Sequence, residues 1–167
     1  AANIRETNCL LMTEILFNGH LDNLNLNELV SFFSCFTNIS VQDDYKTNII
    51  HNNKLSQLMM TYKNWKNKYT HLDEYMQIEE EHFDIIDECY DWCDAENEVD
   101  CKKITNDLFN KGLFVGEFVK AILKINNIVN ECITSCEVID NIPLLEKLNK
   151  IGDKTLKYIV LQQSLYI

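Results

Sequence analysis

The chain has 167 residues and a mass of 19.6 kDa, which is the size of one domain with a substantial hydrophobic core. Hydrophobic residues make up 46% of it, its mean hydropathy is −0.20, and no apolar run approaches the roughly 18 residues that span a bilayer, so disorder and membrane spanning are both disfavoured. A net charge of −11 at pH 7 provides no global basic field, which argues against strong nucleic-acid binding by the surface as a whole.

The negative charge is concentrated in one segment. Residues 79–100 hold eleven acidic residues and no Lys or Arg, so they account for the whole net charge. The rest of the chain has 15 acidic and 15 basic residues and is neutral on average. We therefore expect local charge, rather than net charge, to decide what the protein binds. The acidic residues of the segment are Glu79, Glu80, Glu81, Asp84, Asp87, Glu88, Asp91, Asp94, Glu96, Glu98 and Asp100.

The scarcity of turn residues predicts an all-α fold. Four Gly and one Pro leave long segments without an obligatory break, which suits helices better than a hairpin-rich β fold. Asn18-Gly19 is a stop signal after the first apolar pattern, and Asn25 with Glu28 predicts a capping box at the start of the second. In chain order, the apolar spacing predicts helices over residues 7–17, 26–36, 49–69, 72–93, 101–110, 115–139 and 143–160.

Polar stretches separate these predicted helices. Residues 37–48 and 94–100 are expected to be loops, and Lys111-Gly112 is expected to form a turn before the longest helix. No repeat, linker or low-complexity tract is visible. Residues 1–167 are therefore predicted to form one compact helical domain.

The sequence contains no catalytic signature. None of its four glycines stands in a G-x-x-x-x-G-K-[ST] loop, so this chain alone cannot be a P-loop ATPase. Glu79-x-x-His82 is a single copy of a di-iron helix motif that needs two copies and two further Glu, and a solvated acidic face is the favoured interpretation. We expect no catalytic residue, metal or cofactor in the chain itself.

Seven cysteines are spread through apolar patterns rather than set out as a disulfide framework, which favours a reducing, intracellular setting. Two pairs, Cys89 with Cys93 and Cys132 with Cys136, have a spacing of four that places each pair on one helix face. Together they could in principle form a four-thiolate zinc site, although structural zinc usually uses shorter knuckles on loops. Because each pair lies in an apolar stripe, packing as small hydrophobic side chains is favoured.

One polar strip on the predicted 115–139 helix is the best candidate for binding. At 100° per residue, four polar residues fall within about 60° of arc. The strip is either an ordinary solvated face or a surface that touches phosphates or bases, and composition does not decide between them. Its members are Lys120, Lys124, Asn127 and Glu131, and the apolar residues opposite are Phe118, Ile122, Val129 and Cys136.

Three blocks of sequence carry a family resemblance. The first consists of residues 10–19, which read L-L-M-T-E-I-L-F-N-G, followed by residues 29–36, which end S-C-F. In the second, residues 89–93 read C-Y-D-W-C, and in the third, residues 116–167 end I-V-L-Q-Q-S-L-Y-I. They resemble L-L-x-T-E-x-L-F-N-G with A-x-L-L-S-C-F, Y-E-W-C and D-I-V-x-x-x-S-L-Y-L of the DSHCT domain. That domain closes the exosome-associated DExH-box RNA helicases of the superkiller and mRNA-transport type. The blocks span the chain in the family's order, which makes the match specific.

The resemblance implies a C-terminal fragment of an ATP-dependent, 3′-to-5′ superfamily-two RNA helicase. The P-loop motor domains, which bind ATP and Mg, would lie upstream and outside this chain, and the chain alone would have no activity. In such helicases the helical bundle packs across both motor domains, and a long ratchet helix lines the channel for single-stranded RNA. By position, that helix is residues 115–139. The implied partners are the upstream motor domains, single-stranded RNA bound weakly by the domain alone, and RNA-processing proteins.

The resemblance also implies RNA-contacting positions. Lys120 and Lys124 match family positions that carry base-contacting Arg; they keep the charge but lose the planar fork that stacks on a base. Asn127 lies on the same strip, and Ser40 matches a position that is acidic in the family. The segment 92–116 is longer and more acidic than is usual in the family. These departures distinguish this chain from the family pattern.

Other functions stay open at this point. In the main alternative, the acidic helix over residues 79–93 docks a basic partner and the domain makes no direct contact with RNA. A helix-turn-helix DNA binder over residues 101–139 is disfavoured because its second helix offers only two Lys near its start and no Arg. We expect an intracellular protein, and the Asn-rich, Lys-over-Arg usage indicates an AT-rich genome such as that of a large DNA virus or a protozoan.

Overall fold

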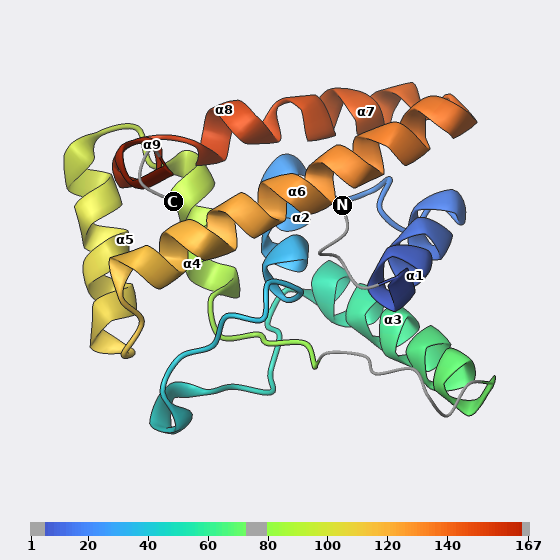
Figure 1. The fold of residues 1–167 in the computed structure, drawn as a ribbon, viewed down its shortest axis with the longest axis horizontal. Coiled ribbons are helices and arrows are strands. Elements are labelled where there is room, and N and C mark those ends of the chain that lie inside the picture. Colours follow the sequence, from blue (N-terminus) through green and yellow to red (C-terminus); the bar gives the residue numbers. More distant parts are fainter. Residues whose placement is uncertain (1–5, 73–79, 165–167) are drawn as a thin grey trace.

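The computed structural model describes residues 6–72 and 80–164, and all regular structure in those residues is helical (Figure 1). The prediction of an all-α fold is confirmed. No helix in this part of the chain is both long enough and apolar enough to cross a membrane. The elements are α1 (Glu6–Phe17), α2 (Leu26–Ser34), the 3₁₀ turn η1 (Asp43–Tyr45), α3 (Asn53–Leu72), α4 (Ile86–Asp94), α5 (Glu98–Asn110), α6 (Val115–Ile139), α7 (Ile142–Asn149), α8 (Ile151–Thr155) and α9 (Ile159–Ser164).

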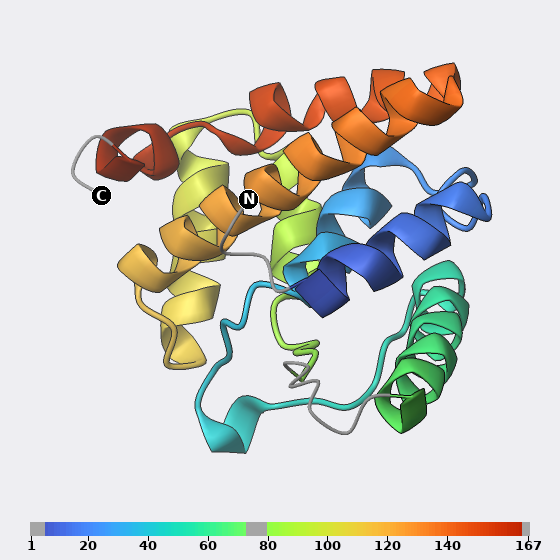
Figure 2. The same cartoon turned by 45° about the vertical axis from the view of Figure 1, so that its right-hand side comes forward.

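Helix α6 is the centre of the arrangement. It crosses in front of α2 and α4 in Figure 1, and it packs against α1, α2, α5, α7, α8 and α9. Helices α7 and α8 run back along it, as both views show (Figures 1 and 2). This position follows from the sequence, because one side of the 25-residue helix is apolar along its length and buries nine side chains. Its bounds are those predicted from the sequence.

The sequence blocks that carry the family resemblance form part of the core. Leu11 of α1 and Phe33 of α2 are fully buried. Trp92 of α4 is also fully buried, with its ring 5.0 Å from that of Phe118 in an edge-on contact. Its indole N–H donates a hydrogen bond to the carbonyl oxygen of Thr155 at 2.9 Å. That bond satisfies the single polar atom of a large apolar side chain, so packing explains why Trp stands in this block.

The predicted start of α2 and end of α1 are both confirmed. The Asn25 side chain accepts a hydrogen bond from the backbone N–H of Glu28 at 2.8 Å, and the Glu28 carboxylate accepts one from the Asn25 N–H at 3.0 Å. These reciprocal bonds are the predicted capping box. After α1, Gly19 adopts φ +77°, the left-handed conformation that ends many helices and that favours glycine.

The prediction of one helix over residues 72–93 is wrong for residues 80–85, which are not helical, while residues 73–79 lie outside the described part of the chain. Helix α4 begins only after residue 85. The segment before it lies against the end of α2, where the N–H of His82 donates to the carbonyl oxygen of Cys35 at 3.0 Å. Tertiary contacts therefore override the helical spacing of apolar residues in this stretch.

Several further boundaries differ from prediction. Helix α2 ends two residues earlier than expected, at Ser34, and α3 begins at Asn53 rather than at residue 49, where the Asn52 side chain accepts the Leu55 N–H at 3.1 Å.

The single last helix expected from Pro143 is three short helices, with a break at Lys150 and another before Tyr158, which adopts φ +53°. A left-handed residue cannot be part of a continuous helix, so Tyr158 separates α9 from α8 whatever the spacing of apolar residues; Lys150, at the other break, has φ −88°. Helix α5 begins at Glu98, three residues earlier than expected, because the Asn97 side chain caps it by accepting a backbone N–H at 2.9 Å.

Candidate nucleic-acid interface

The polar strip predicted on the long helix lies on the exposed side of α6. Lys120, Lys124 and Asn127 are exposed, and Glu131 is partly buried. The helix is held by six neighbouring helices, so these side chains project from a rigid scaffold. The side chains predicted to lie opposite the strip are buried: Phe118, Ile122, Val129 and Cys136.

Among the described residues, Lys120 is held by one weak surface contact. Its Nζ lies 3.4 Å from the Glu117 carboxylate one turn earlier, and the two side chains are 54% and 46% exposed. An exposed pair of this spacing contributes at most a few tenths of a kcal/mol, roughly 0.3 to 0.5. A phosphate group could therefore replace Glu117 as the partner of Lys120 at little cost.

Lys124 forms a shorter contact than Lys120, a hydrogen bond to the loop between α2 and α3. Its Nζ donates a hydrogen bond to the carbonyl oxygen of Thr37 at 2.9 Å. Further along the loop, the N–H of Gln42 donates to the carbonyl oxygen of Lys111 at 3.2 Å, at the turn before α6. Ser40 lies between these two contacts. The structure therefore places the loop that carries Ser40 alongside the N-terminal half of α6.

The charges of the strip nearly cancel. Lys120 and Lys124 supply two ammonium groups, and Glu117 and Glu131 supply two carboxylates on or beside the same face. Asn127 adds a neutral amide that can donate to a phosphate or to a base edge. Such a surface can make individual contacts with a nucleic-acid strand but provides no strong field to hold one.

The acidic segment is not uniformly solvated, so the interpretation favoured from the sequence is wrong for three of its residues. Asp84 is 4% exposed and accepts a backbone N–H of the α2–α3 loop at 2.8 Å. Glu88 is 9% exposed and accepts hydrogen bonds from Lys111 on both oxygens, at 3.0 and 2.9 Å. Glu81 pairs with Lys66 of α3 at 2.9 Å. The acidic residues that α4 does leave exposed are Asp87, Asp91 and Asp94.

The pair formed by Glu88 and Lys111 fixes the start of the candidate helix. Burial raises the pKa of Glu88 above its ordinary value, although the hydrogen bonds and the positive charge of Lys111 act in the opposite direction. Lys111 also donates to the carbonyl oxygen of Asp84 at 3.2 Å. Because Lys111 stands in the turn between α5 and α6, these bonds tie that turn to α4.

The paired cysteines lie in the core, which confirms their interpretation as small hydrophobic side chains. Cys89, Cys93, Cys132 and Cys136 are all buried. Burial raises the pKa of Cys93 to about 12 and that of Cys136 to about 11, so both thiols stay protonated at neutral pH. Within residues 6–72 and 80–164, no group of three or more His, Cys, Asp or Glu side chains is placed to hold a metal ion.

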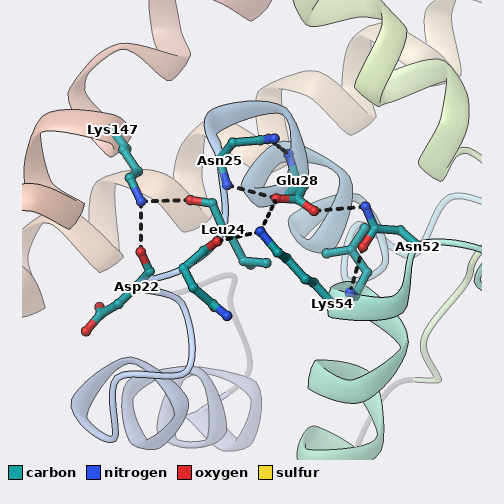
Figure 3. Close-up of polar contacts among 9 residues, drawn as sticks. Asp22, Leu24, Asn25, Glu28, Asn52, Lys54 and Lys147 are labelled. Carbon is teal, nitrogen blue, oxygen red and sulfur yellow. Dashed lines mark hydrogen bonds and ion pairs between the residues drawn. The ribbon is translucent and has the colours of Figure 1, made fainter.

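A second set of charged side chains, at the turn before α2, is used inside the fold (Figure 3). Lys147 of α7 donates to the carbonyl oxygens of Asp22 and Leu24, both at 2.8 Å. Glu28 accepts a hydrogen bond from Asn52 Nδ2 at 2.8 Å in addition to its capping bond. These contacts join α2, α3 and α7. We call the set the polar junction; its labelled members are Asp22, Leu24, Asn25, Glu28, Asn52, Lys54 and Lys147.

No site is predicted on α3 from the sequence, yet its surface is unusual in charge. Residues 45–72 hold five Lys and no acidic residue, although the chain as a whole has 26 acidic residues. Lys63 and Lys68 are exposed on this helix. The absence of acidic residues is a signal that can be read directly from the sequence.

These features define a class of protein: an all-α domain organised around one long helix that presents a polar strip. A model of the DSHCT (NUC185) domain matches residues 1–163, and the chain belongs to that family. The DSHCT domain is found at the C-terminus of DExH-box helicases, so the chain is a helicase-associated domain. No curated protein matches the chain.

Proposed function

We propose that this domain guides RNA and braces the motor in an ATP-dependent, 3′-to-5′ RNA helicase of superfamily two. In this proposal α6 lines the channel for single-stranded RNA, and the domain has no activity of its own. ATP and Mg would bind the motor domains upstream, outside the 167 residues of this chain. The observation that carries the proposal is the exposed strip on α6, the helix against which most of the domain packs.

The weak contacts of the strip suit translocation. Lys120 can exchange its surface carboxylate for a phosphate, and the nearby carboxylates keep the field around the strand close to neutral. A motor that moves along RNA must release at each step what it held in the previous one. Contacts of this strength allow that release, whereas a strongly basic groove would resist it.

The packing of α6 supports the bracing role. The helix is in contact with elements from both ends of the chain, from α1 to α9, so a displacement of α6 would have to move much of the domain with it. A rigid helix of 25 residues spans roughly 37 Å at 1.5 Å per residue, long enough to contact two neighbouring domains. We propose the upstream motor domains as these partners, in an intracellular complex that also engages RNA-processing proteins.

The proposal is tested by Lys120→Glu in the parent helicase, meaning the longer protein that would carry this domain. Losing one phosphate contact and adding a negative charge should lower the rate of RNA unwinding about 3- to 10-fold. The ATPase rate measured without RNA and the melting temperature should stay close to those of the unsubstituted enzyme. Lys150→Glu, an equal charge change at an exposed position between α7 and α8, is the matched control. Normal unwinding by Lys120→Glu would remove the assignment of α6 as the RNA-contacting helix.

A second candidate function rests on α4. Asp87, Asp91 and Asp94 are exposed and are spaced so that they share one helix face. That face would dock a basic partner protein, with the lysines of α6 merely solvated. Replacing the three aspartates by Asn should abolish capture of such a partner in a pull-down while leaving unwinding intact; the converse result favours the RNA-guiding role.

A further inference from the structure

The exposed face of α3 combines amide and ammonium groups without a carboxylate. On a helix with 100° per residue, six of its exposed residues fall within about 100° of arc. Lys63 and Lys54 are also exposed and lie about 40° beyond the two ends of this arc; Lys54 pairs with Glu28 at 3.8 Å. We call the set the α3 amide face: Asn53, Gln57, Met60, Asn64, Asn67 and Lys68.

The opposite side of α3 holds the helix in the domain. Leu55, Leu58, Met59 and Tyr62 are buried, and α3 packs against α1. Both views place α3 at the edge of the molecule (Figures 1 and 2). The amide face is therefore the outward side of a helix that is firmly attached through its apolar side.

In the described part of the chain, the acidic segment pairs with the inner flank of α3. Lys66 pairs with Glu81 at 2.9 Å, and both side chains are largely buried. The Lys63 ammonium lies 4.9 Å from the centroid of the Phe83 ring, a contact that leaves its charge uncompensated. Among the described residues, neither Lys63 nor Lys68 forms an ion pair. The two lysines therefore give the outward side of α3 a positive local charge, although the chain has a net charge of −11.

We infer that the α3 amide face binds the phosphate backbone of single-stranded RNA, as a second contact in addition to the α6 strip. Amide and ammonium donors are among the groups that contact phosphate oxygens, and the face has no carboxylate to repel them. The one large apolar residue on it is Met60, which is too little for the apolar centre of a protein interface. The contact is to backbone, so it is independent of base sequence. The inference rests on the proposed function for its choice of RNA.

The test measures binding of a fluorescein-labelled oligouridylate to the 167-residue chain by anisotropy, over a salt series that starts at low ionic strength. The double variant Lys63→Gln/Lys68→Gln should bind about 10-fold more weakly at the lowest salt and should lower the salt slope by about 1.4, the value for two single-strand phosphate contacts. The matched control is Lys150→Gln/Lys154→Gln, which makes the same change in net charge at exposed positions of the α7–α8 region. Circular dichroism verifies that each variant is folded.

Three kinds of result would overturn the inference. The first is an equal loss in the control, which would mean that only net charge matters. The second is undiminished binding by the α3 variant, or no binding by the unsubstituted chain at the lowest salt. The third is equal competition by polyglutamate of matched length, which would make the face a docking site for acidic protein. Lys120→Gln is measured in parallel and reports on α6 alone, so failure of the α3 inference and failure of the proposed α6 function are distinguishable.

Discussion

The polar junction and the α6 strip both contain lysines and glutamates, but they use them in opposite ways. In the junction, Lys147 gives its ammonium hydrogens to two backbone carbonyls at 2.8 Å, and Glu28 is 4% exposed with its oxygens engaged by neighbouring donors (Figure 3). In the strip, Lys120 faces solvent and meets one half-exposed carboxylate at 3.4 Å. Charge is a structural element in the first region and remains available to a ligand in the second.

Lys124 stands between these two extremes. It is on the exposed side of α6, yet its Nζ is bonded to the Thr37 carbonyl oxygen at 2.9 Å. An ammonium group has three hydrogens, so one such bond leaves capacity for a phosphate. The charged residues can therefore be ordered by how many of their possible hydrogen bonds are made within the fold. This order predicts the effect of each substitution on stability.

The largest loss of stability is expected for Glu28→Ala in the polar junction. The change removes the side-chain half of the capping box and leaves the Asn25 N–H and the Asn52 amide without their acceptor in a partly buried site. We expect the free energy of unfolding to fall by about 2 to 4 kcal/mol, measured by urea denaturation followed by circular dichroism. Glu117→Ala on the strip is the matched control and should change it by less than about 0.5 kcal/mol. Equal losses would erase the distinction between the two regions.

A matched pair of lysines gives the next largest difference. Lys147→Met keeps the aliphatic stem but breaks two hydrogen bonds to carbonyls that close the turn before α2, so we expect a loss of about 1 to 3 kcal/mol. Lys120→Met should stay within about 0.5 kcal/mol of the unsubstituted protein. The measurement is again urea denaturation. A loss for Lys120→Met as large as that for Lys147→Met would mean that the strip is structural.

Lys124→Met should have an intermediate effect. It breaks one charged hydrogen bond to the loop that carries Ser40, which corresponds to about 0.5 to 1.5 kcal/mol. Hydrogen exchange should also show faster exchange of the loop amides between Thr37 and Gln42, because the loop loses its attachment to α6. Unchanged exchange in that loop would show that Lys124 does not hold it, and the residue would then belong with Lys120.

How far the sequence predicts this fold depends on whether local or distant contacts decide an element. Helix α6 was predictable to the residue because its apolar period runs unbroken, and the capping box of α2 joins residues three apart. The 72–93 prediction fails because Glu81 and Asp84 turn inward to partners on α3 and on the α2–α3 loop. Single-sequence periodicity assigns acidic residues to solvent and has no means of finding such partners.

In the candidate site too, some features follow from local spacing and others from contacts between distant residues. The exposure of Lys120, Lys124 and Asn127 follows from helical spacing alone and was predictable. The bond from Lys124 to Thr37 joins residues 87 apart, and it decides how much of that lysine is left for a ligand. The contacts of Lys147 with the turn before α2 span an even longer separation. Spacing identifies which charges face outward, but only the packed structure shows which of them are already used.

The smallest effect expected is a pH dependence of the free energy of unfolding that arises from Glu88. This residue of the acidic segment is buried and hydrogen-bonded within the fold, as Glu28 is in the polar junction. Burial raises its pKa in the folded state above the ordinary value of 4.5, so the folded chain takes up this proton more readily than the unfolded chain. As the pH falls through the raised pKa toward 4.5, Glu88 should therefore contribute progressively more to the free energy of unfolding. Glu88→Gln cannot titrate and lacks this contribution.

The measurement is the difference in unfolding free energy between the unsubstituted chain and Glu88→Gln, followed from about pH 7.5 to about pH 5. As the pH falls, the unsubstituted chain should become more stable relative to Glu88→Gln. Lys111→Met removes the charge and hydrogen bonds that lower the Glu88 pKa, so in that background the shift should begin at a higher pH. A shift of the opposite sign would mean that pairing with Lys111 outweighs burial, and Glu88 would then be a paired ion whose charge stabilises the turn before α6.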